Sequence, residues 1–199
     1  MVTSPGREIE LSGVPAAGTK PSNLTVEAVY RAHARTVARW ARRLLGPCAD
    51  YEDIVHEVFL VVERRLSEFR GDAAITTWLY EITIRVVQNA RKRARRWSWL
   101  TGRGHYQGQG ESAEVLPGAS RDPEVELEAR EQTRLLYQLL DELSESQRTV
   151  LILFELEGMS GSQIAEITGA SVSTIWVRLS RARRKFLERM RAWEAREAS

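Results

Sequence analysis

The sequence predicts an all-α protein with two small helical domains joined by a flexible linker. Apolar residues recur with a helical period in two stretches of the 199-residue chain, and no convincing strand pattern interrupts them. Between these stretches, residues 100–123 are rich in Gly, Ser, Gln and Pro, which is typical of a linker. The expected order is a flexible tail (1–23), a first domain (24–97), the linker (98–124), a second domain (125–191) and a short tail (192–199).

The first domain is expected to begin with two helices. The first helix is predicted from about Thr25 to Leu45, where Gly46-Pro47 stops it. Asp50 can cap the second helix. The buried face of that helix is marked by apolar residues at every fourth position, namely Ile54, Val58, Val62 and Leu66.

A third helix is expected after a loop at Phe69-Arg70-Gly71-Asp72. It carries the apolar residues between Trp78 and Val87 and continues into a basic run from Arg91 to Arg96. Such a run either binds DNA phosphates without recognising the base sequence, or is a solvated end of the helix that keeps the protein soluble. Trp97 and Trp99 follow it, and they either stack on bases or cap the domain core, of which we favour the core.

The second domain contains a pattern typical of a helix-turn-helix. Ser160 with Gln163 forms a capping box, and Ser144 with Gln147 forms another one upstream. Gly169 supplies the tight turn, and Ser171 can cap the following helix. That helix carries Ile175 and Leu179 inward and a set of basic residues around the rest, namely Arg178, Arg181, Arg183, Arg184 and Lys185. Since the major groove accepts one helix and arginine fits guanine edges and phosphates, the pattern predicts DNA binding.

Charge is distributed unevenly although the net charge is only +2. Residues 85–103 hold seven Arg or Lys and no acid, and residues 176–191 hold seven basic residues and one acid. Residues 111–131 reverse the sign with seven acids. Two basic blocks favour two nucleic-acid contacts, although a pair of solvated helix faces would show the same pattern.

Several classes of protein are disfavoured by composition. Cys48 is the single cysteine, which fits a reducing compartment. No apolar run approaches the roughly 20 residues that span a bilayer, and no secretion signal is evident, so we expect a cytoplasmic protein without membrane insertion. We find no catalytic constellation, no metal-ligand set and no phosphate-binding glycine loop, and therefore expect neither an enzyme nor a cofactor.

Three segments in order resemble one family, the sigma-70 factors. The segment from Asp50 to Leu60 resembles their polymerase-binding helix, Phe69-Arg70-Gly71-Asp72 with residues 77–82 resembles their promoter-melting segment, and residues 143–183 resemble their C-terminal helix-turn-helix. The two-domain length is similar to that of the extracytoplasmic-function (ECF) group. The resemblance implies a transcription initiation subunit that binds the β′ and β subunits of core RNA polymerase and promoter DNA, and that an anti-sigma factor commonly holds inactive.

The resemblance implies three contact surfaces. The polymerase surface would comprise Glu52, Asp53, His56 and Glu57, with His56 where the family usually has Gln; an ordinary solvated face is the alternative. The −10 surface would comprise Phe69, Arg70, Gly71, Asp72, Thr76, Thr77, Tyr80, Arg85, Asn89, Arg91, Lys92, Arg93, Arg95 and Arg96. There Thr76, Thr77 and Tyr80 would line a pocket for a flipped base, Trp78 would pack in the core, and Arg85 stands where the family often has Asn.

The −35 surface lies at the start of the recognition helix. It would comprise Ser171, Ser173, Thr174, Trp176, Val177, Arg178, Ser180, Arg181 and Arg184. Trp176 departs from the family, which usually has a basic or polar residue there. The linker would either pass through the polymerase interior or act as a plain tether. A stand-alone helix-turn-helix regulator is the second hypothesis, against which the melting-domain pattern argues.

Overall fold

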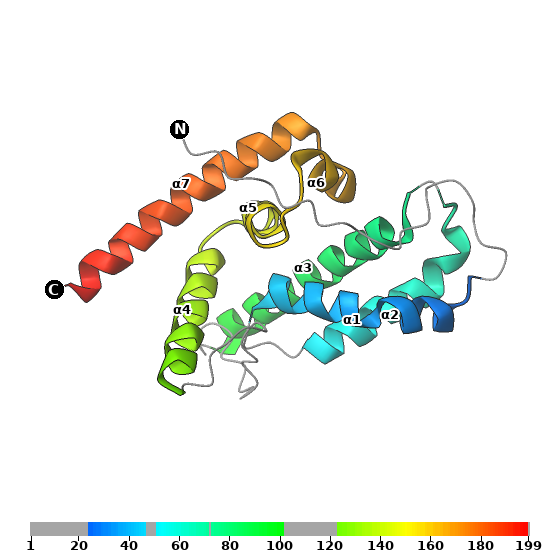
Figure 1. Cartoon of the computed structure of the whole chain (residues 1–199), viewed down its shortest axis with the longest axis horizontal. Coiled ribbons are helices and arrows are strands. Elements are labelled where there is room, and N and C mark those ends of the chain that lie inside the picture. Colours follow the sequence, from blue (N-terminus) through cyan, green and yellow to red (C-terminus); the bar gives the residue numbers. More distant parts are fainter. Residues whose placement is uncertain (1–23, 47–50, 72, 102–122, 199) are drawn as a thin grey trace.

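The structure is a computed structural model that describes residues 24–46, 51–71, 73–101 and 123–198. Within these ranges it contains seven α-helices and no strand (Figure 1). Three helices, namely α1 (Val26–Leu45), α2 (Tyr51–Arg65) and α3 (Ile75–Thr101), form an N-terminal unit. Four helices, namely α4 (Pro123–Asp141), α5 (Glu145–Leu151), α6 (Gly161–Thr168) and α7 (Val172–Glu197), form a C-terminal unit.

The N-terminal unit is a bundle in which each of its helices packs against the other two. Thr25 caps α1 by accepting a hydrogen bond from the Ala28 amide at 3.2 Å, and α1 ends at Gly46 as predicted. The predicted stripe of α2 is confirmed, because Val58 and Val62 have no exposed surface. Pro47, expected to help stop the first helix, and Asp50, expected to cap the second, lie outside the described residues. Helix α3 runs to Thr101, beyond the predicted end of the domain at residue 97.

The C-terminal unit follows the predicted local rules closely. Both capping boxes are present, at Ser144 with Gln147 and at Ser160 with Gln163. Gly169 ends α6 in the left-handed conformation (φ 66°), which glycine adopts without steric cost. Ile175 and Leu179 of α7 are fully buried against α5 and α6. The helix-turn-helix that the sequence predicts is therefore formed by α6 and α7.

One element was not predicted. Residues 152–156 directly after α5 form a π-helix, in which the Glu157 amide donates to the Ile152 carbonyl at 3.1 Å. A π-helical turn holds one more residue than the corresponding α-helical turn. In the sequence, the apolar residues Leu153 and Phe154 do not reveal the π-helix, because one inserted residue changes the helical period of apolar positions only locally.

The two units are not merely tethered. Figure 1 shows α5 lying between α7 and α3, and α4 beside the C-terminal end of α3. Helix α6 contacts α3, and the π-helical segment contacts α1. Tyr137 of α4 lies so close to Gly46 that a Cβ atom there would come within 2.8 Å of its ring. The sequence analysis predicted two domains and a linker but did not foresee this contact.

Gly169 offers a direct test of the turn between α6 and α7. Gly169→Ala places a Cβ atom in the left-handed region and should lower the free energy of unfolding by about 1–2 kcal/mol, although no neighbouring atom obstructs it. Gly169→Asn is the matched control, because asparagine tolerates this conformation better and should lose less. Urea unfolding followed by circular dichroism measures both, and equal stability of the three proteins would contradict the assignment.

Candidate nucleic-acid and polymerase interfaces

The start of α7 presents a polar surface built on a buried stripe. Ser171 accepts a hydrogen bond from the Thr174 amide at 3.2 Å, and its hydroxyl also lies 3.0 Å from that of Ser173. The N-terminus of a helix carries a partial positive charge, so these hydroxyls stand where an anion is favoured. Among the side chains that follow on the same helix, Ile175, Leu179 and Ala182 are buried. Trp176, Val177, Ser180 and Arg181 are exposed, and Arg178 is half-buried.

The basic residues of α7 fall into two sets. Arg178, Arg181 and Arg184 make no ion pair with any residue that the structure describes. Arg183 instead pairs with Glu155 at 2.7 Å, and Lys185 donates to the Glu142 carbonyl at 2.6 Å. The sequence placed all five around the helix and assigned Arg178, Arg181 and Arg184 to the −35 surface, and these three are the ones without an ion pair in the described part of the chain.

Trp176 packs against its own unit. Its ring meets Phe154 edge-on, with the ring centroids 5.6 Å apart. A Cβ atom at Gly161 would lie 2.9 Å from the Trp176 ring, so the absence of a side chain there makes room for the indole. Nevertheless, 47% of Trp176 remains exposed beside Val177. The Trp176 indole therefore packs between α7 and α6, while one side of the ring remains exposed.

The acidic residues of α2 lie on its outer face. Glu52, Asp53 and His56 are exposed, as the polymerase hypothesis requires. Glu57 is partly covered, because Arg93 of α3 donates hydrogen bonds to both of its carboxylate oxygens, at 2.8 and 3.2 Å. A predicted polymerase contact and a predicted DNA contact are thus paired with each other.

Both aromatic residues among the predicted −10 contacts are buried, which corrects the sequence analysis. Tyr80 is 1% exposed and meets Trp40 edge-on at 4.2 Å, and burial raises its pKa. Phe69 is 7% exposed and stacks at a tilt on Trp78, with 5.2 Å between centroids. Neither ring can line a pocket for a flipped base in this conformation. Both were misassigned because aromatic residues beside a loop serve a base pocket and a core equally well.

Several other residues of this surface remain reachable. Arg70, Arg85 and Asn89 are exposed, and Arg85 pairs with Glu81 one turn earlier on the same helix. Thr76 and Thr77 are half-buried at the start of α3, and Gly71 is buried with φ 82°. Asp72 lies outside the described residues.

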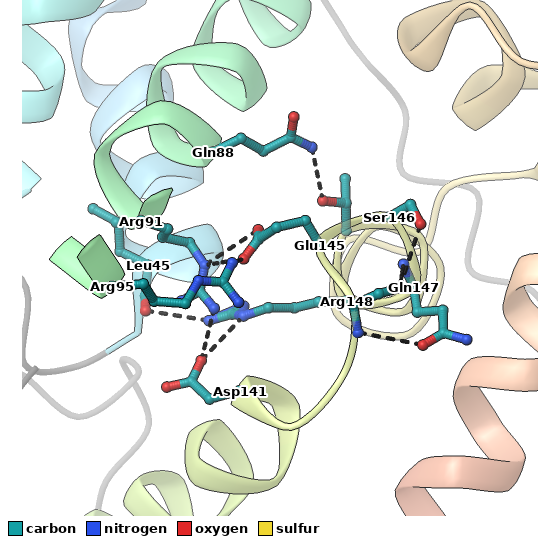
Figure 2. A network of polar contacts seen from close by, with 11 residues as sticks. Leu45, Gln88, Arg91, Arg95, Asp141, Glu145, Ser146, Gln147 and Arg148 are labelled. Atoms are coloured by element: carbon teal, nitrogen blue, oxygen red, sulfur yellow. Dashed lines mark hydrogen bonds and ion pairs between the residues drawn. The ribbon is translucent and has the colours of Figure 1, made fainter. Parts of the chain in front are cut away.

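Most arginines in the basic run of α3 form ion pairs with acidic residues. Arg91 binds Asp141 and Glu145 of the C-terminal unit, and Arg95 also binds Glu145 (Figure 2). Lys92 and Arg96 are exposed and form no ion pair within the described part of the chain. Trp97 and Trp99 are 70% and 84% exposed, so the expectation that they cap the core is wrong.

Sequence reasoning missed one charged residue entirely. Arg148 of α5 is 2% exposed, although arginine is rarely buried without full pairing. Burial lowers the pKa of Arg148 to about 10, and the neighbouring Arg91 contributes to that shift. Its position two residues before the apolar run 150–154 was the available signal, since a basic residue beside a buried stripe needs a partner from elsewhere.

Comparisons with known proteins identify the family of the chain. Residues 29–97 match the family model described as Sigma-70 region 2, and residues 133–186 match that described as Sigma-70, region 4. The ECF RNA polymerase sigma-E factor of Haemophilus influenzae is 32% identical over 82% of this chain and 84% of its own. The chain belongs to the sigma-70 family, in its ECF group. As a sigma factor, it acts in promoter-directed initiation of transcription by RNA polymerase.

Other relatives of this sigma factor extend the likeness. The RNA polymerase sigma-H factor of Pseudomonas aeruginosa is 32% identical over 79% of the chain and 88% of its own length. Among solved structures, the sigma factor RpoE in complex with the anti-sigma factor NepR, from Bartonella quintana, gives a TM-score of 0.59. It is 22% identical and covers 83% of this chain and 96% of its own, which shows a shared fold.

None of the helices described for this sigma factor is long and apolar enough to cross a membrane.

The recognition helix of this sigma factor can be tested with one paired substitution. Arg181→Ala should weaken binding of the polymerase complex to a promoter by about 1–3 kcal/mol if the guanidinium contacts a base. Arg191→Ala is the matched control, because Arg191 is an exposed arginine further along α7. Binding is measured on a duplex selected from genomic fragments by transcription, and an equal loss for both variants would contradict base recognition by Arg181.

Proposed function

We propose that α7 reads the −35 promoter element while α3 and the preceding loop read the −10 element. The observation that supports it is the set Arg178, Arg181 and Arg184, which stays unpaired within the described residues on a helix whose opposite face is buried. A row of arginines without ion pairs in the described part of the chain suits the major groove, where arginine recognises guanine and the helix N-terminus meets phosphates.

The N-terminal unit would act on the −10 element by a different mechanism. Arg70, Lys92 and Arg96 are exposed and would bind phosphates, which positions DNA without reading it. Thr76 and Thr77 stand half-buried at the start of α3 and would contact an unpaired base. With Tyr80 and Phe69 in the core, the walls of such a pocket would come from these threonines and from Arg70 of the preceding loop.

The outer face of α2 would bind core polymerase through Asp53, His56 and Glu57. Exposed acids at such a surface steer association with a basic partner and set its orientation. We further propose that the chain has no catalytic activity of its own and works in the cytoplasm. An anti-sigma factor would keep it inactive, as suggested by the solved complexes of CnrH with the cytosolic domain of CnrY and of RpoE with NepR.

Transcription from fragmented genomic DNA, with core polymerase and this protein present together or singly, tests the proposal. We expect discrete start sites only when both are present, and alignment of those sites would yield the two promoter elements. Specific duplex binding by the protein alone, without new start sites, would instead identify a stand-alone regulator.

The pairing of Glu57 with Arg93 permits a sharper test of the polymerase surface. Glu57→Lys and Arg93→Ala break the same ion pair, and exposed pairs contribute only about 0.2–1 kcal/mol to stability. Only Glu57→Lys removes a carboxylate that polymerase would bind, so it alone should reduce affinity for core polymerase in the absence of DNA. If Arg93→Ala reduces affinity equally, the carboxylate acts through the ion pair and the direct contact is refuted.

A further inference from the structure

The exposed face of α7 has an apolar centre. Ile175 and Leu179 mark the buried side of the helix, and Val177 lies midway between them in the sequence, so its side chain points to the opposite side. Val177 is 49% exposed. Ser173 and Arg181 lie about one turn before and after it on the same face and are exposed as well. The middle of the face that we assign to the −35 element is therefore an aliphatic side chain and not a hydrogen-bonding one.

The Trp176 indole enlarges this apolar centre on the side of α6. One side of the indole is exposed, next to Val177 in the sequence. The other side has two fixed neighbours. Phe154 meets the ring edge-on, and Gly161 leaves room where a Cβ atom would lie 2.9 Å from the ring atom Cζ2. A side chain that is held in this way loses little further conformational freedom when its open side binds a partner.

The chemistry of the major groove limits what such an apolar centre can recognise. The base edges present hydrogen-bond donors and acceptors there, and the C5 methyl of thymine is the apolar group that distinguishes one base from another. An apolar side chain against a donor or acceptor deprives that group of water without replacing its hydrogen bond. Against a methyl group, both apolar surfaces leave water favourably. An apolar centre on a helix in this groove therefore favours thymine over the other bases.

We propose that Val177 and Trp176 recognise thymine in the −35 element by contact with its C5 methyl group. This proposal rests on the proposed −35 function of α7 and names the base and the chemical group that α7 recognises. Val177 and Arg181 are four residues apart, which places their Cβ atoms about 5–6 Å apart on one face. Neighbouring bases of one strand are about 3.4 Å apart along the duplex, so the thymine should lie within about two base pairs of a guanine bound by Arg181.

Replacement of thymine by uracil tests the proposal, because the two bases differ only in the C5 methyl group. Each thymine of the −35 element, located by alignment of the start sites, is replaced singly in a promoter duplex. Binding by the complex of this protein with core polymerase is then measured. At one or more positions uracil should weaken binding by about fourfold, which corresponds to the roughly 0.8 kcal/mol of one buried methyl-sized group. An element without thymine, or one that loses no affinity at any position, would overturn the proposal.

The uracil penalty should also depend on the two apolar side chains. Val177→Ala and Trp176→Ala should each lower the ratio of affinities for the thymine and uracil duplexes. Leu187→Ala is the matched control, because Leu187 is another exposed apolar residue further along α7. Each variant is compared on two duplexes, so a general loss of folding or of polymerase affinity does not change the ratio. An undiminished penalty in either variant, or an equal reduction in the control, would contradict the thymine contact.

Gly161 allows the position of the indole to be tested without a change to the ring itself. Gly161→Ala places a Cβ atom 2.9 Å from Cζ2 of Trp176 and should displace the indole, although alanine by itself favours the helix. We expect Gly161→Ala to lower the uracil penalty in the otherwise unchanged protein and to have no further effect in the Trp176→Ala variant. An equal reduction in both backgrounds would show that Gly161 does not act through Trp176, contrary to the proposal.

The two proposals fail in different ways. If α7 does not read the −35 element, Arg181→Ala and exchanges of base pairs in that element will leave binding unchanged, and uracil will have no effect either. If only the thymine contact is wrong, Arg181→Ala and the base-pair exchanges will still weaken binding, whereas uracil will not.

Discussion

Burial of one stripe of α7 is the constraint on which the rest of the C-terminal unit depends. Ile175 and Leu179 have essentially no exposed surface, and their contacts with α5 and α6 determine which way the helix faces. The opposite side is then left to polar and basic residues, of which Arg178, Arg181 and Arg184 form no ion pair within the described residues. Core packing therefore determines which arginines of α7 remain exposed and available to DNA.

The N-terminal unit differs, because several of the arginines that we propose to bind DNA are already paired with acidic residues of the chain. Arg93 is bound by Glu57 of its own unit, whereas Arg91 is bound by two acids of the other unit. Exchange of one anion for another on a guanidinium leaves the arginine paired throughout. A protein that binds polymerase and DNA in turn can use such exchanges, because a new anionic partner replaces the previous one on the same arginine.

Local rules explain which elements could be predicted from the sequence. The capping boxes, the left-handed Gly169 and the buried stripe of α7 depend on residues a few positions apart, so the sequence alone determines them. The burial of Tyr80 depends on Trp40 in another helix, and that of Arg148 depends on α1 and α4. No spacing rule relates such distant positions. The exposed Trp97 and Trp99 were misjudged because α3 continues as a helix beyond the body of its unit.

The π-helical turn at residues 152–156 has a geometric consequence for the whole C-terminal unit. Each residue of an α-helix advances the chain by about 100° around the axis. An extra residue therefore rotates everything that follows by about that angle relative to α5. This turn therefore contributes to the direction in which Glu157 points toward Arg43 and, together with Gly158 (φ 67°), to the direction in which α6 leaves α5. Loss of a single residue from this turn would re-aim the recognition helix while leaving every side chain of α7 intact.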